Sequence, residues 1–70
     1  MTHKEQESYE NLISVGFTDA QAVTLIDLIY QVFRFNVLDR TEKLIAAGFT
    51  EEQAKVLIEV TYRAKGWELP

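Results

Sequence analysis

The sequence predicts an all-α fold, a small bundle of four short helices built from two tandem helix-corner-helix repeats. The phrase at Leu12–Ala22 recurs 32 residues later at Leu44–Ala54. Overlaying residues 9–35 on residues 41–67 without a gap gives 11 identities in 27 positions, which indicates internal duplication. No segment has the alternation typical of a strand. We therefore expect a single domain, 1–70, with repeats at about 4–34 and 36–67.

The tripeptide Gly-Phe-Thr is expected to form the corner of each repeat. Gly16 follows an apolar helical run and suits the left-handed position that closes a helix. Thr18 can cap the next helix, and Gln21 three residues later can complete a capping box. The same three positions recur in the second repeat as Gly48, Thr50 and Gln53.

Four helices follow from these corners and from the apolar spacing around them. Asn36 is a suitable cap for the third helix. Gly66 can close the fourth helix, and we expect Trp67 to fold back on its last turn. The predicted helices are Lys4–Val15, Asp19–Phe33, Val37–Ala47 and Glu51–Lys65.

The predicted core consists of the apolar positions that the two repeats share. These positions recur at helical spacing, so one face of each helix is expected to be buried. The seven pairs, in repeat order, are Leu12 with Leu44, Ile13 with Ile45, Phe17 with Phe49, Ala22 with Ala54, Leu25 with Leu57, Ile26 with Ile58, and Tyr30 with Tyr62.

The second predicted helix is apolar over more than half of its circumference, which indicates burial on more than one side. A chain of 70 residues has few partner helices to cover such a surface. We therefore expect a homodimer packed through this helix, with a monomer in which the helix is simply central as the alternative. The expected interface residues are Val23, Leu28, Ile29, Val32 and Phe33.

The net charge of −4 arises in the first repeat. An acidic surface repels nucleic-acid phosphate, so direct DNA or RNA binding by a helix-turn-helix is not expected. The acidic residues form either a solvated face or a rim for a basic partner. This acidic rim comprises Glu5, Glu7, Glu10, Asp19 and Asp27.

The sequence is poor in the cysteine and histidine residues that commonly act as nucleophiles, general bases or metal ligands. The sequence has no cysteine and one histidine, His3, which lies outside the predicted core. We therefore expect no catalytic residues, no metal and no cofactor, and the chain is not expected to be an enzyme. The apolar runs are too short to span a membrane and no signal peptide is evident, so we expect a soluble cytoplasmic protein without membrane contact.

The second repeat resembles the head segment of the mitochondrial calcium uniporter regulator family and of its bacterial coiled-coil relatives. The resemblance comprises Phe35-Asn36-Val37-Leu38, then Leu44, then Gly48–Ala54, and the first repeat shares the Gly16–Ala22 part. Asn36 and Val37 replace the Asp and Thr of that family, the unit is doubled, and we expect neither the coiled-coil stalk nor the membrane anchor. The resemblance implies a small helical head that self-associates and contacts proteins, and it does not extend to calcium regulation.

A looser similarity connects the second repeat with ubiquitin-associated domains through Leu44, Gly48, Phe49, Ala54 and Leu57. Those domains have three helices, whereas the sequence predicts two helices in each repeat. The leading hypothesis is a non-enzymatic helical module for protein interaction and oligomerisation. The alternative is a small acidic inhibitor, of the phage or mobile-element type, acting on a nucleic-acid-handling complex.

Overall fold

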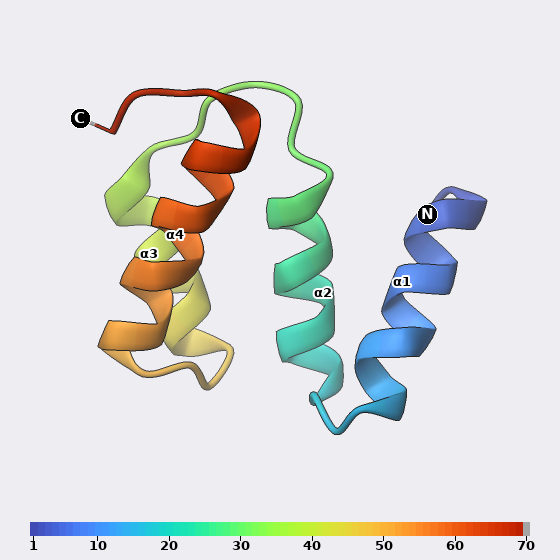
Figure 1. Ribbon diagram of the computed structural model, residues 1–70. Helices are drawn as coiled ribbons and strands as arrows, with labels where there is room; N and C mark the ends of the chain where they lie inside the picture. The colour runs from blue at the N-terminus through green and yellow to red at the C-terminus, as the bar shows by residue number, and fades with distance from the viewer. Residues whose placement is uncertain (70) are drawn as a thin grey trace.

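The computed structural model describes residues 1–69 and confirms the predicted all-α class (Figure 1). Its helices are α1 (His3–Ser14), α2 (Asp19–Ile29), α3 (Val37–Ala46) and α4 (Glu51–Lys65). No strand occurs within residues 1–69. α1 and α2 form one hairpin and α3 and α4 form the other. The hairpins lie side by side, with α2 between α1 and the second hairpin.

Both corners have the structure that the Gly-Phe-Thr tripeptide predicts. Gly16 and Gly48 have φ angles of +106° and +109°, which side-chain-bearing residues rarely adopt. The Thr18 hydroxyl accepts a hydrogen bond from the backbone N–H of Gln21 at 3.1 Å, and the Gln21 side chain accepts one from the N–H of Thr18 at 3.0 Å. Thr50 and Gln53 form the same capping box. These local bonds satisfy the N–H group of each capping threonine and of the third residue of α2 and α4.

α4 has the predicted bounds, but α2 ends at Ile29 and not at Phe33 as predicted. Gly66 closes α4 with a φ of +74°, and the N–H of Trp67 reaches back to the carbonyl of Tyr62 at 2.8 Å. Repeat 1 has Arg34 at the position of Gly66, so no glycine closes a helix of that length. The chain leaves α2 four residues earlier and forms a linker, residues 30–36, that leads to α3.

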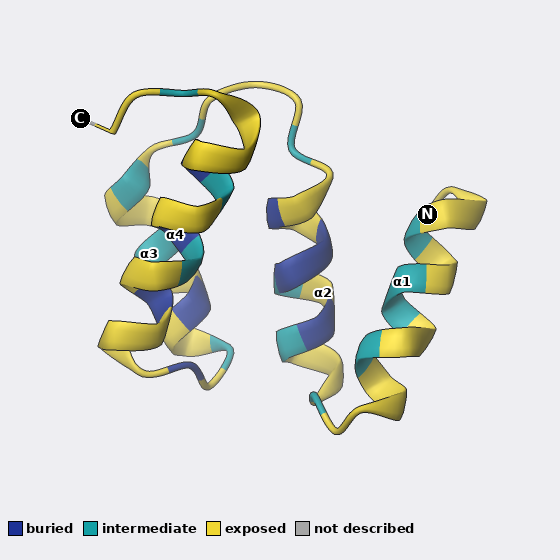
Figure 2. Cartoon of the chain, in the orientation of Figure 1, coloured by how far each residue is buried: buried dark blue, intermediate teal, exposed yellow. Residues whose placement is uncertain are grey.

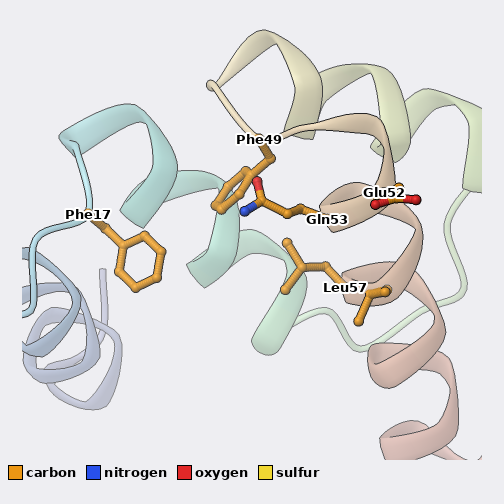
Figure 3. Close-up of a pocket in the computed structure, with 6 residues that line it drawn as sticks. Phe17, Phe49, Glu52, Gln53 and Leu57 are labelled. Carbon is orange, nitrogen blue, oxygen red and sulfur yellow. The ribbon is translucent and has the colours of Figure 1, made fainter.

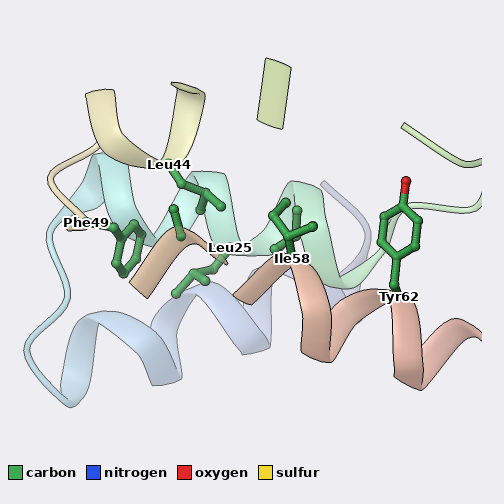
Figure 4. Packing of buried hydrophobic residues seen from close by; sticks show 7 residues of the cluster. Leu25, Leu44, Phe49, Ile58 and Tyr62 are labelled. Carbon is green, nitrogen blue, oxygen red and sulfur yellow. The ribbon is translucent and has the colours of Figure 1, made fainter. Parts of the chain in front are cut away.

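The core lies mainly between α2 and the second hairpin (Figure 4). Leu44 and Ala54 are fully buried and Ile58 is almost so, as the sequence predicts. At one end of the core Tyr62 packs edge-on against Phe35 and Trp67, with ring centroids 5.2 and 5.4 Å away. The buried cluster comprises Leu25, Leu28, Leu44, Phe49, Ala54, Ile58 and Tyr62.

Three predicted core residues are exposed, namely Ile13, Ile45 and Tyr30. Ile13 and Ile45 come one residue after the inward-facing leucine of their helices, so they are turned about 100° away from the core. The bundle is too thin to cover that second direction, since α1 contains no buried residue at all (Figure 2). The prediction for Ile13 and Ile45 is therefore wrong. It is also wrong for Tyr30, which lies one residue beyond the end of α2 and contacts α1 at the surface.

Polar contacts hold α1 onto α2. The Tyr30 hydroxyl lies 2.9 Å from the Ser8 hydroxyl and donates to the carbonyl of Lys4 at 3.4 Å. Near the corner, the Tyr9 hydroxyl donates a hydrogen bond to the Asp19 carboxylate. The first hairpin thus combines a partly buried apolar seam with hydrogen bonds that are open to solvent.

The hairpins are less symmetric than their sequences. α3 packs against α2 as well as α4, whereas α1 packs against α2 alone. Leu28 on α2 is consequently 2% exposed, while Val60, its equivalent on α4, is 55% exposed. The same helix face is therefore buried in the first repeat, on α2, and exposed to solvent in the second, on α4.

Candidate interaction surface

The structure does not bring the five predicted interface residues together. Leu28 belongs to the buried core, so its assignment to an exposed interface is wrong. Val23 lines a hollow between α2 and α3, and Ile29 lies at the end of α2. Val32 and Phe33 are in the linker, where they are 76% and 78% exposed. The physical reason is the early end of α2, which removes the last two residues from the helical face that the sequence predicts.

The predicted acidic rim is divided between two helices. On α1, Glu5 accepts a hydrogen bond from the backbone N–H of Thr2 at 3.0 Å, which lowers the pKa of its carboxyl group. Glu7 and Glu10 are exposed on the same helix. Asp19 and Asp27 instead line the hollow between α2 and α3, which also contains the basic residues Arg40 and Lys43. These acids do not gather around one concave site.

Asp19 changes the titration of Tyr9. The hydrogen bond to the Asp19 carboxylate is the largest cause of a raised pKa of the Tyr9 hydroxyl, since the carboxylate stabilises the protonated phenol. Its stabilising effect is therefore present below the ordinary tyrosine pKa of about 10 and is lost as the pH rises through the raised value. We expect Asp19→Ala to lower the pKa of Tyr9, as measured by phenolate absorbance. An unchanged titration curve would contradict this contact.

An apolar groove lies where the two corners meet (Figure 3). The rings of Phe17 and Phe49 approach each other across it, with centroids 6.3 Å apart and planes tilted by 48°. The groove has a volume of about 440 Å³ and is shallow and widely open to solvent. Its lining residues are Phe17, Phe49, Glu52, Gln53, Val56 and Leu57. Most of this lining is apolar, so burial against a partner would be favourable.

The groove continues along α4 as a stripe of mostly apolar residues, which we call the α4 stripe. Val56 and Val60 are each more than half exposed, and Leu57 is half-buried beside them. Their spacing places them on one side of the helix. The α4 stripe consists of Gln53, Val56, Leu57, Val60 and Ala64.

In the first repeat, part of the equivalent stripe is covered by the second hairpin. On α2 the corresponding residues include Leu25 and Leu28, which are buried against the second hairpin. At the position of Thr24 on α2, α4 has Val56, so the exposed copy is the more apolar of the two at that point. The change from Thr24 to Val56 is the signal in the sequence that points to this surface. It can be interpreted only once the structure shows which side of α4 is uncovered.

The structure offers little else that resembles a site. Among residues 1–69 no three His, Asp or Glu side chains gather where they could hold a metal ion. Within the same range no helix has the length and apolar character needed to cross a membrane. Comparison with protein-family models, curated proteins and solved structures found no match for the chain. The groove and the α4 stripe are therefore the features from which a function can be inferred.

Proposed function

We propose that this chain is a non-enzymatic helical module for protein interaction that self-associates as a homodimer. The observation that carries the proposal is the exposed apolar face of α4 around Val60, since Leu28 at the equivalent position of α2 is buried inside the same chain. Burying this apolar face against a partner lowers the free energy by about 25 cal/mol per Å² of apolar area removed from water.

The thin core supports the same proposal. α1 contributes no fully buried residue, and the core contains no disulfide because the sequence has no cysteine. Small domains commonly obtain the missing stabilisation from oligomerisation. The resemblance to the head segment of the mitochondrial calcium uniporter regulator family agrees with this proposal, because it implies a helical head that self-associates.

Self-association is tested by sedimentation equilibrium over a range from about 10 µM to about 1 mM, where interfaces of modest size associate. The monomer has a mass of 8.1 kDa, so we expect the average mass to rise toward twice that value as the concentration increases. The dimer buries apolar surface, so it should persist in high salt, which screens only the charged contribution. A mass of 8.1 kDa at every concentration would refute the homodimer.

A further inference from the structure

We infer that the α4 stripe binds the α4 stripe of a second copy of this chain, with the two helices antiparallel. This inference rests on the proposed function and adds to it the contact surface, the orientation and the register. Three observations carry it, namely the uncovered apolar face, the length of the stripe and the order of charges along its edge.

The stripe has the pattern of a helix-pairing seam. Gln53, Val56, Val60 and Ala64 recur at intervals of three and four residues, which is the spacing that keeps side chains on one face. The seam extends over about 17 Å, since a helix rises 1.5 Å per residue. Ala64 is small, so it allows a second helix to approach closely at that end.

The register follows from the position of the two valines. If two antiparallel α4 helices cross at the level of Ile58, Val56 of one copy lies opposite Val60 of the other copy. The twofold axis repeats this contact, as it does in any isologous interface. Ala64 of the second copy then lies beside the part of the stripe that borders the groove. Each copy thus covers the exposed valines of the other.

The charges along one edge of the stripe select the antiparallel orientation. Glu52 and Arg63 are eleven residues apart, about three helical turns, so both flank the stripe on the same side. They lie about 9 Å and about 7.5 Å from the level of Ile58 in opposite directions. In the antiparallel pair Glu52 of each copy is therefore opposite Arg63 of the other. Glu59 lies between them on the same edge and is ion-paired with Arg63 of its own helix. A parallel pair would place the Glu52 and Arg63 edges of the two copies on opposite sides of the seam, so neither contact could form.

The charged side chains are free to make these contacts. Arg63 is 77% exposed and forms an ion pair with Glu59 at 3.0 Å within its own helix, a contact that leaves other donors of its guanidinium available. Glu52 is exposed and has no ion pair among the described residues. Lys55 and Glu51 pair with each other at 3.8 Å on another side of the helix, away from the stripe.

The first experiment locates the surface. Val60→Glu places a charge in the proposed seam, whereas Val32→Glu makes the same change at an exposed residue of the linker. Both positions are open to solvent, so we expect both variants to fold, as measured by circular dichroism. Val60→Glu should weaken the dimer at least about tenfold in sedimentation equilibrium, because it buries a charge without a partner in the seam. An undiminished dimer for Val60→Glu, or its loss in Val32→Glu alone, would overturn the α4 contact.

The second experiment tests the orientation by reversing charges. Glu52→Arg alone and Arg63→Glu alone should each weaken the dimer roughly tenfold, since like charges then meet at two symmetric places. The double variant should restore the affinity of the original chain. An equimolar mixture of the two single variants should also associate, because one copy then carries only positive charge at the two positions and the other copy only negative charge.

Glu51→Arg is the matched control for the charge reversals, since it makes the same change one residue earlier and away from the stripe. It should leave the dimer unchanged. In a parallel dimer the single variants would cause no loss, because the two charged edges then lie on opposite sides of the seam, and that result would overturn the antiparallel pairing. If the original chain dimerises while none of these variants matters, the α4 contact fails and the proposed function stands. If the original chain is monomeric throughout, both fail.

Discussion

Leu28→Ala is expected to lower the free energy of unfolding by about 2–5 kcal/mol, the range for removing a buried leucine side chain. Leu28 is 2% exposed and packs in the cluster that joins α2 to the second hairpin. Its removal would leave a cavity in the contact between the hairpins. A domain of this size has a core worth only a few kcal/mol in total, so the variant should be largely unfolded at room temperature.

The second repeat supplies the control for this prediction. Val60 occupies the position of Leu28 in the repeat but is 55% exposed. We expect Val60→Ala to change the stability of the monomer by about 0.5 kcal/mol or less, as is usual at the surface. Urea denaturation followed by circular dichroism, at a concentration where the chain is monomeric, measures both variants. Equal losses at the two positions would contradict the unequal burial of the two helix faces.

Tyr62→Ala should be at least as damaging, with an expected loss of about 3–5 kcal/mol, the range for deleting a large buried aromatic side chain. Tyr62 is 3% exposed, and its ring makes edge-on contacts with Phe35 and Trp67. Its hydroxyl donates a hydrogen bond to the carbonyl of Phe35 at 2.9 Å. The side chain therefore fastens the linker and the chain after α4 to the end of the core.

Two further variants separate the causes of this loss. Tyr62→Phe keeps the ring and removes the hydroxyl, so we expect it to cost about 1 kcal/mol, the net worth of one hydrogen bond. Tyr30→Ala alters the equivalent residue of the first repeat, which is 36% exposed, and should cost clearly less than Tyr62→Ala. Thermal unfolding followed by circular dichroism would rank the three variants. A larger loss for Tyr30→Ala than for Tyr62→Ala would contradict the placement of the aromatic cluster.

The corners and caps were predictable because their causes are local. A glycine with a positive φ and a threonine that caps the next helix act within a few residues, so the sequence pattern is sufficient to place them. The bounds of α4 follow for the same reason, with Thr50 at one end and Gly66 at the other. The end of α2 was harder to predict, because no glycine closes this helix. The linker that follows it packs through Phe35 against Tyr62 and Trp67, which are distant in the sequence.

The amino-acid sequence by itself determined the helices, their capped corners and most of the core, all of which depend on residue type and spacing along one chain segment. Only the tertiary structure decided which copy of a repeated face is covered. Leu28 and Val60 occupy the same repeat position and are both branched apolar residues, so residue type does not indicate which of them is buried. Their exposures differ because α3 packs against α2, whereas α1 makes no contact with α4. Burial depends on such contacts between distant segments, so the surface available to a partner emerged only from the packing of the two hairpins.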